Sequence, residues 1–224
     1  MGTIGLLKFG EIEHIKRFML QGELYFNTVE YFSANQHDGT SHFRFDRFEG
    51  SSHIYQPDQV AKITIAGMEV KMHPDAGPII MRVSRSEYYT HVFCLTNVSE
   101  PVVVEGTKRV FDPRMFKFGT AAAMILDTIA FMDLLAQYIK KSTDIAELKA
   151  GYVEYFDAKE YSGETGAFRK ADTYSYQREC RIALNTATEG PYTMRLGSLK
   201  GIAYGPILQK DCINLIKDEM AILS

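Results

Sequence analysis

Residues 174–184 read Tyr-Ser-Tyr-Gln-Arg-Glu-Cys-Arg-Ile-Ala-Leu, and this stretch decides the fold expected for the rest of the chain. Side chains alternate between the two faces of a β-strand. Written as a strand, the stretch places Gln177, Glu179 and Arg181 on one face and its apolar side chains on the other. A carboxylate between an amide and a guanidinium on a core-packed strand predicts a fixed polar group rather than a solvated run of charges.

Composition is that of an ordinary globular protein. The 224 residues are 46% hydrophobic and 24% charged, which favours a single domain over residues 1–224. The net charge of −3 argues against a general nucleic-acid coat. Three cysteines without Cys-x-x-Cys spacing and the lack of a signal peptide predict a cytoplasmic protein. The most apolar run, residues 121–136, is too short to span a bilayer, so no membrane association is expected.

The order of the expected elements predicts an α+β fold with mixed or mainly antiparallel sheets and about three to four helices. Gly22 is expected to end the first helix, Asp127 to cap the second, and Asn27 to cap a short turn. The expected helices cover 11–21, 128–141 and 207–219, with a turn at 28–33 and strands at 4–9, 24–26, 53–56, 60–65, 68–73, 79–84, 91–97, 102–105, 122–126, 152–157, 174–184, 192–196 and 201–204. The core stripe expected for the second helix consists of Ile129, Met132, Leu135, Tyr138 and Ile139.

A second polar motif lies in the loop expected over residues 34–52. Its residues 43–50 read Phe-Arg-Phe-Asp-Arg-Phe-Glu-Gly, so Arg44 and Asp46 alternate with aromatic side chains. Two interpretations stay open, a surface loop tied by an Arg–Asp pair or a loop that carries an acid and a base to a pocket. The second interpretation predicts that Arg44, Asp46 and Glu49 lie within side-chain reach of the polar face of 174–184.

Other side chains near these motifs are candidates for ligand contacts. Tyr174 and Tyr176 could stack on a planar ligand or pack in the core. Lys170, beside Arg169, would add positive charge for a phosphate-bearing ligand. Glu179 could act in a site or form an ion pair with Arg181. No metal site is expected at His37, Asp38 and His42, because their spacing matches no known ligand motif.

Several motifs together resemble an uncharacterised bacterial and phage-borne family of unknown function. They are Leu24-Tyr25-Phe26-Asn27, Glu30-Tyr31-Phe32, Arg44-x-Asp46-x-x-Glu49-Gly50, Phe116-Lys117-Phe118-Gly119, Phe168-Arg169-Lys170, Tyr176-Gln177-x-Glu179-x-Arg181 and Leu196-Gly197-Ser198-Leu199. The resemblance spans most of the chain and implies a single domain, but it brings no established activity.

The chain also resembles mono-ADP-ribosyltransferases, including toxin-like enzymes that modify nucleic acid. The likeness lies in a short opening strand and helix and in a glutamate on a late strand. It implies NAD as the cofactor, with Glu179 polarising the ribose hydroxyl and stabilising an oxocarbenium-like transition state. It also implies that Tyr174 or Tyr176 packs the nicotinamide and that Arg44 holds the diphosphate. The first strand carries Lys8 where such enzymes commonly have Arg or His.

Three functions therefore stay open. The first is an NAD-dependent, ADP-ribosyltransferase-like enzyme in phage defence or a toxin-like role. The second is a non-enzymatic binding or regulatory module that recognises a polar ligand, such as a nucleotide-like molecule, or a macromolecular partner. The third is a metal-dependent nuclease that uses Asp46, Glu49 and Glu179 around a divalent ion.

Overall fold

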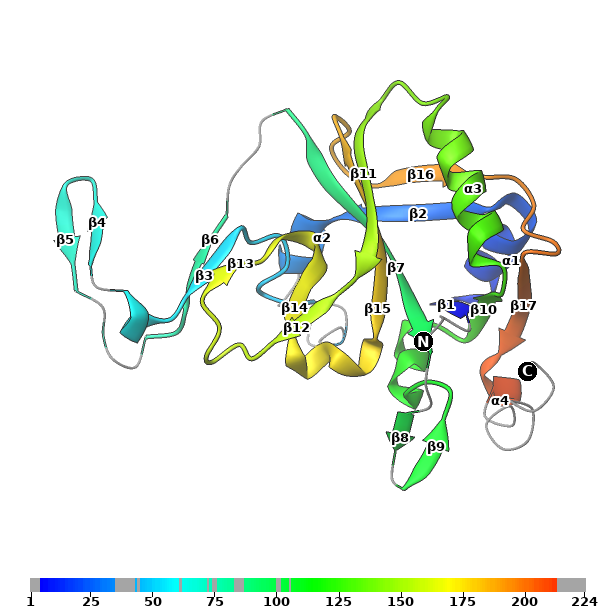
Figure 1. Ribbon diagram of the computed structural model, residues 1–224, viewed down its shortest axis with the longest axis horizontal. Helices are drawn as coiled ribbons and strands as arrows, with labels where there is room; N and C mark the ends of the chain where they lie inside the picture. Colours follow the sequence, from blue (N-terminus) through cyan, green and yellow to red (C-terminus); the bar gives the residue numbers. More distant parts are fainter. Residues whose placement is uncertain are drawn as a thin grey trace.

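The computed structural model describes residues 5–34, 43, 45–60, 62–71, 73, 76–82, 87–99, 102–104 and 106–212. One antiparallel sheet of eight strands dominates it (Figure 1). Its strands are β1 (Gly5–Gly10), β2 (Glu23–Thr28), β7 (Tyr89–Val98), β10 (Ala121–Ile125), β11 (Ile145–Tyr152), β15 (Glu179–Thr186), β16 (Tyr192–Arg195) and β17 (Ala203–Leu208). Six of them follow the order β11-β15-β7-β1-β10-β17, while β2 pairs with both β7 and β16.

Smaller elements surround this sheet. The remaining strands are β3 (His53–Tyr55), β4 (Ile63–Ile65), β5 (Met68–Val70), β6 (Ile79–Met81), β8 (Val102–Val104), β9 (Thr107–Arg109), β12 (Glu154–Phe156), β13 (Gly163–Glu164) and β14 (Arg169–Ala171). The α-helices are α1 (Ile12–Gln21), α2 (Val29–Ala34), α3 (Thr128–Ile139) and α4 (Gln209–Cys212). The 3-10 segments are η1 (Pro57–Gln59), η2 (Pro113–Phe118), η3 (Gly166–Phe168) and η4 (Asp172–Gln177).

The two faces of the sheet are covered differently. Helices α1 and α3 pack on one face, where Phe18 and Phe131 join Phe93 and Ile182 of the sheet in the largest buried apolar cluster. The opposite face of β7 and β15 lies beneath the chain segment that contains β12, η3, β14 and η4. Eight consecutive residue pairs join β7 to β15, and β11 pairs with the other side of β15. β15 is therefore an interior strand next to the terminal strand β11, with its polar face toward that segment.

The expected α+β fold class with about three to four helices is wrong. The described residues contain eight helical segments, of which only α1 and α3 have seven residues or more. Helices account for 26% and strands for 42% of these residues, in a fold dominated by the antiparallel sheet. The other six segments have six residues or fewer, which is too short to show a 3.6-residue periodicity in the sequence.

The strand expected over residues 174–184 is also wrong in part. Residues 172–177 form the 3-10 segment η4, and the strand begins only at Glu179. Arg178, with a φ of 45°, adopts a left-handed conformation at the junction and breaks the strand that the alternating pattern predicted. The strand β11 was expected only from residue 152 onward, and residues 203–208 form a strand where the last helix was expected to begin.

Helix ends were predicted better than helix faces. Gly22 ends α1 in the left-handed conformation, and Asp127 accepts a hydrogen bond from the Ala130 N–H at the start of α3, as expected. The expected core stripe of α3 is wrong in part, because Ile129 is 76% exposed. Thr28, rather than Asn27, accepts the hydrogen bond from Tyr31 N–H at the start of α2.

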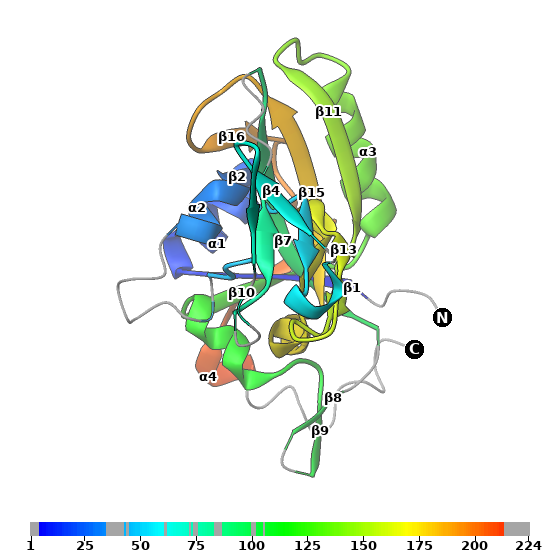
Figure 2. The same cartoon turned by 90° about the vertical axis from the view of Figure 1, so that its left-hand side faces the viewer.

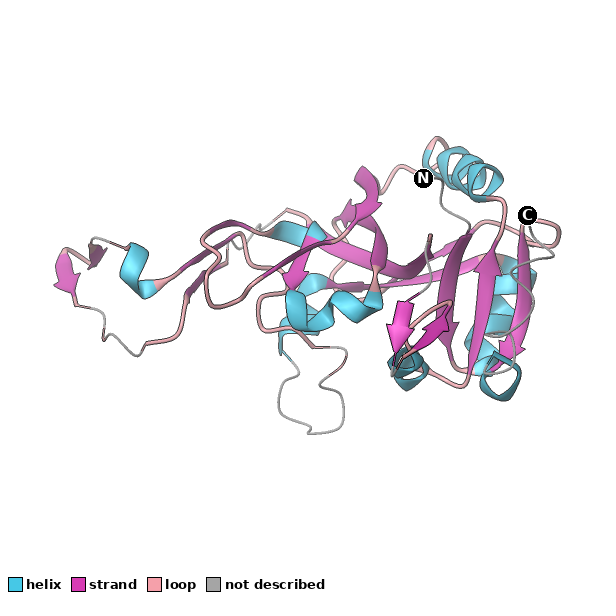
Figure 3. Cartoon of the chain, turned by 60° about the horizontal axis from the view of Figure 1, so that its bottom comes forward, coloured by secondary structure: helices cyan, strands magenta, loops and turns pink. Residues whose placement is uncertain are grey.

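Two hairpins extend from the body of the molecule. The β4–β5 hairpin lies at the far end of the β3–β6 ribbon, and β8–β9 extends from another side (Figures 1 and 3). Neither hairpin contributes a residue to the four buried apolar clusters of the described chain. Among the helices of the described residues, none has the length and apolar character needed to cross a membrane.

Candidate functional site

One side of β7 changes its strand partner halfway along. Residues 96–98 pair with β1, whereas residues 91–92 pair with β2. The two partners diverge on either side of Cys94, and we call this point the fork. Asn97 donates its backbone N–H to the Arg178 carbonyl on the β15 side. Cys94 lies three positions away, so its N–H and C=O face the fork.

A cavity of about 560 Å³ lies at the fork, and we call it the fork pocket. Its walls come from β1, α1, β2 and β7, which lie far apart in the sequence. The Nζ atom of Lys8 donates a hydrogen bond to the Cys94 carbonyl at 3.1 Å and lies 4.1 Å from the centre of the Phe93 ring. The cavity volume falls within the range of about 300–1,000 Å³ that is typical of small-molecule sites.

The deep side of the fork pocket is formed by five buried polar residues, which we call the buried cluster. These residues are Glu49, Lys170, Gln177, Glu179 and Arg181, and none is more than 6% exposed. The cluster combines side chains from the loop before β3, from β14, from η4 and from β15.

Arg181 is the centre of the cluster. Its Nη1 and Nη2 atoms bind the two carboxylate oxygens of Glu49 at 2.6 and 2.9 Å, and its Nε atom binds Oε2 of Glu179 at 2.6 Å. Nη1 also donates to the carbonyl of Ala167 at 2.6 Å. Bidentate contacts of this kind fix both the position and the plane of the guanidinium.

Lys170 completes the cluster from the other side of Glu179. Its Nζ atom lies 2.6 Å from Oε1 of Glu179 and 2.8 Å from Oε1 of Gln177. Gln177 in turn donates to the carbonyl of Phe43 at 2.8 Å. Two cations and two carboxylates therefore neutralise one another, and the amide ties them to the loop that contains Phe43.

The opposite charges in the buried cluster stabilise the ionised forms of its side chains. Burial alone would raise the pKa of Glu179, but the charges of Arg181 and Lys170 outweigh burial and hold this pKa well below its usual range. Burial would lower the pKa of Lys170, yet Glu179 raises it above the ordinary value. Burial likewise opposes the charge of Arg181, and Glu179 and Glu49 raise its pKa. Glu179, Lys170 and Arg181 are therefore charged at neutral pH.

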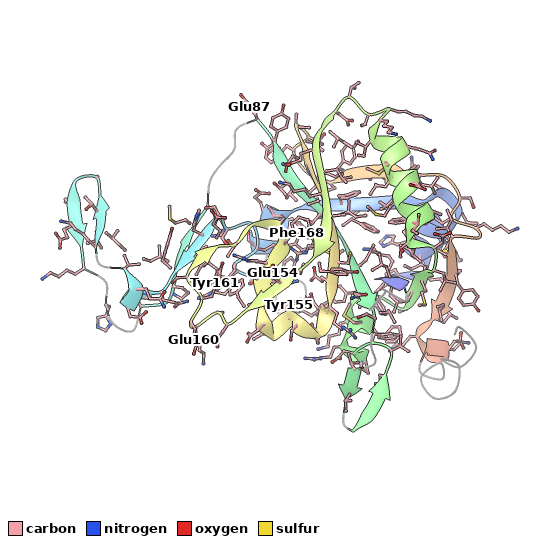
Figure 4. All side chains as sticks on the ribbon, viewed as in Figure 1. Glu87, Glu154, Tyr155, Glu160, Tyr161 and Phe168 are labelled. Atoms are coloured by element: carbon pink, nitrogen blue, oxygen red, sulfur yellow. The ribbon has the colours of Figure 1, made fainter. Side chains whose placement is uncertain are left out.

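The segment above the sheet supports the cluster. Glu179 donates its backbone N–H to the hydroxyl oxygen of Tyr155 at 2.8 Å, and Figure 4 labels this tyrosine beside Glu154 and near Phe168. Burial raises the pKa of the Tyr155 hydroxyl, so it stays protonated. The position of Glu179 is thus fixed through both its backbone and its side chain.

Of the polar residues in the loop motif of residues 43–50, only Glu49 is seen to join the buried cluster among the residues that the structure describes. Glu49 meets Arg181 directly, as predicted. Asp46 is buried but accepts hydrogen bonds from the backbone N–H groups of Phe48 at 3.0 Å and Ala171 at 3.2 Å, so it ties the loop to β14. Arg44 lies outside the described residues, as do His37, Asp38 and His42.

The tyrosines proposed for ligand stacking have other contacts. Tyr174 donates its hydroxyl to the carbonyl of Phe45 at 2.6 Å, and the ring of Tyr176 lies 3.7 Å from the guanidinium carbon of Arg114. Neither tyrosine is among the described residues that line the fork pocket. Lys170, proposed for a phosphate, does line it but is neutralised by Glu179.

Sequence reasoning missed the aromatic residues of the pocket. Tyr25 and Tyr31 line it and are 53% and 41% exposed. On β2, Tyr25 stands between the fully buried Leu24 and Phe26, and this alternation was the available signal that its ring points away from the core.

The described side chains at the site can supply charge and hydrogen bonds, but they form neither a metal-binding group nor a reactive thiolate. No group of three or more His, Cys, Asp or Glu side chains in the described part of the chain is arranged to hold a metal ion. Glu49 and Glu179 are bound by cations, which would compete with a divalent ion for them. Burial raises the pKa of the Cys94 thiol to about 12, so this residue is not a thiolate at neutral pH.

Comparisons of the chain with protein-family models, with curated proteins and with solved structures find no match, so its function is inferred from the geometry of the fork pocket.

Proposed function

We propose that this protein binds a nucleotide-like small molecule in the fork pocket. The observation that carries the proposal is a single cavity with a rigid, charged deep side and an aromatic mouth. A nucleotide has a planar ring at one end and hydroxyl and phosphate groups along its length. These features correspond to the two kinds of surface that the pocket presents.

The deep side of the pocket supports the proposal through preorganisation. Each oxygen of the Glu179 carboxylate receives one hydrogen bond within the cluster. A carboxylate oxygen can accept two hydrogen bonds, so Glu179 retains capacity for a ligand hydroxyl. Because the cluster is already fixed by its own ion pairs, little side-chain entropy would be lost when a ligand binds.

The mouth supports the proposal through its aromatic rings. Tyr25 and Tyr31 lie at the pocket with partly exposed rings, to which a planar base or nicotinamide could stack. Lys8, whose ammonium group lies at the fork, is positioned to approach a phosphate. NAD, the cofactor implied by the sequence resemblance, has all of these groups.

The proposal is tested by isothermal titration with NAD, ADP-ribose and AMP. Removing a stacking ring costs about 1–3 kcal/mol per base, so Tyr25→Ala and Tyr31→Ala should each weaken binding roughly 5- to 150-fold. Tyr204→Ala is the matched control, because Tyr204 is 64% exposed on β17 and does not line the pocket among the described residues. Absence of binding by all three compounds, or equal losses in all three variants, would contradict the proposal.

A second candidate function is ADP-ribosyl transfer from NAD. It is favoured by the joint placement of Lys8 on the first strand and Glu179 at the start of a late strand, both at one pocket. NAD would supply an ADP-ribosyl group with nicotinamide as the leaving group. Against this, Lys170 and Arg181 reduce the negative potential of Glu179 and so weaken its support of a positively charged transition state.

Release of nicotinamide separates the two candidates. Transfer predicts nicotinamide release from NAD in cell extract, lost in Glu179→Gln while the variant remains folded by circular dichroism and still binds NAD. Binding of NAD without release of nicotinamide would favour the non-enzymatic binding function. The nuclease interpretation is not favoured by any observation of the described residues.

A further inference from the structure

We propose that two copies of this chain associate through the outer edge of β11. The β11 strands of the two copies would pair antiparallel across a twofold axis. In the described chain β11 is the terminal strand of the main sheet, with β15 on one side (Figure 2). It has eight residues, which is long for an edge strand. The backbone direction of this edge and the charges that flank it both support the pairing.

The backbone direction of β11 follows from its register with β15. Val153, directly after β11, donates its N–H to the carbonyl of Glu179 at 3.0 Å, so its backbone groups face β15. Alternate residues of an antiparallel strand direct these groups to opposite sides. Leu148 and Ala150 are an odd number of positions from Val153, so their N–H and C=O groups point away from β15. These groups are available to a strand added at the edge.

The side chains favour a second copy as that strand. Glu147 and Lys149 flank Leu148, share one face of the sheet, and are 45% and 64% exposed in their side chains. An antiparallel pairing centred on Leu148 would place Glu147 of each copy opposite Lys149 of the other. The two copies would then form two reciprocal ion pairs from a single strand sequence, the self-complementarity that a twofold interface requires.

The register is also constrained by hydrogen bonding. Residues whose backbone groups face the edge must oppose one another, so the twofold axis passes beside a residue rather than between two residues. A centre at Lys149 would place the two copies of Lys149 opposite each other, with like charges. A centre at Ala150 would place Lys149 opposite Gly151 and leave the charges without an opposite partner across the interface. A centre at Leu148 satisfies both the backbone and the charges. The 2.9 Å contact between Glu147 and Lys149 within one copy would become part of a four-charge group.

Charge-swap variants test this pairing. Sedimentation velocity over a range of protein concentrations should show the wild type changing from the 25.4 kDa monomer to a species of twice that mass. Lys149→Glu and Glu147→Lys would each place like charges opposite one another and should weaken association about tenfold or more. The double variant Glu147→Lys/Lys149→Glu restores opposite charges and should regain dimerisation.

Mixing the two single variants gives the sharpest result. Lys149→Glu carries two carboxylates at the edge and Glu147→Lys carries two ammonium groups, so an equimolar mixture should form a heterodimer that neither variant forms alone. Lys200→Glu, an exposed charge reversal distant in sequence, is the control and should dimerise as the wild type does. A wild type that stays monomeric, or single variants that dimerise normally, would overturn the proposal. So would a double variant or a mixture that fails to associate while remaining folded.

Discussion

At the scale of single residues, the buried cluster is the feature that most constrains this protein. Arg181 is only 1% exposed and binds two carboxylates and a carbonyl. Removing charges from water costs several kcal/mol per ion, and only complete pairing offsets this cost. The cluster therefore adds little net stability, but the loss of a charged member leaves its direct partners buried with fewer ion pairs.

We expect Arg181→Met to destabilise the protein by about 3–5 kcal/mol, because Glu49 and Glu179 would then lose their shared partner. Arg195→Met is the matched control: Arg195 pairs with Glu23 at 2.9 Å but its side chain is 64% exposed, so its loss should cost about 0–1 kcal/mol. Urea unfolding at neutral pH measures both. Equal effects of the two substitutions would show that burial of the cluster has no energetic consequence.

The depressed pKa of Glu179 predicts how stability depends on pH. A carboxyl with a lowered folded-state pKa adds stability above its unfolded pKa of about 4.3, and this stability is lost as the pH falls toward the folded value. The free energy of unfolding of the wild type should therefore decrease below about pH 4.

The variant Glu179→Gln supplies the comparison, since it cannot titrate at this position. The difference in unfolding free energy between wild type and variant should be large at pH 7 and smaller at pH 3. A difference that is independent of pH would mean that the pKa of Glu179 is not lowered by folding.

At the scale of elements, the fork depends on how tightly α1 is joined to β2. Gly22 ends α1 with a φ of +58°, and a Cβ placed there would lie 2.3 Å from the carbonyl oxygen of Gly197. The neighbouring backbone donates to this turn as well, with Leu196 N–H bonded to the Gly22 carbonyl at 3.1 Å. Because α1 and β2 both line the fork pocket, this close contact helps set its shape.

Gly22→Ala is expected to destabilise the protein by about 1–3 kcal/mol more than Gly190→Ala does. Gly190 also has a positive φ, +90°, but no atom lies within 4 Å of the position that a Cβ would take there. Both variants therefore share the backbone strain, and only the first adds a clash. Thermal unfolding of the two variants checks the difference. Similar melting temperatures would indicate that the 196–197 segment moves aside easily.

At the scale of the whole molecule, the β4–β5 hairpin extends away from a body that packs without it. Its apolar residues Met68 and Val70 are 69% and 38% exposed. An isolated two-stranded hairpin is at best marginally stable in water. The hairpin therefore depends on its attachment, whereas the buried clusters of the body do not depend on the hairpin.

Replacing residues 62–71 by a Gly-Ser-Gly linker should leave the melting temperature within about 4 °C of the wild type, which corresponds to about 1 kcal/mol or less for a chain of this size. NAD titration of the shortened protein should give the affinity of the full chain, because none of the described residues that line the fork pocket belongs to this segment. A large fall in melting temperature would show that the hairpin packs against the body.

The sequence by itself determined local features, since these depend on neighbouring residues. The helix end at Gly22, the cap at Asp127 and the apolar alternation of residues 180–184 all follow from contacts within a few positions. The two polar motifs also predicted that Glu49 would lie within side-chain reach of Arg181.

Only the tertiary structure decided the rest. The strand β11, the exposure of Ile129 and the number of short helical turns depend on partners distant in the sequence, so no local period marks them. The same holds for the fork, which forms because β1 and β2 pair with different residues on one side of β7. The buried cluster around Glu179 lines this pocket, whereas Tyr174 in η4 bonds the Phe45 carbonyl instead. Long-range contacts rather than a local pattern determine which of these side chains meet.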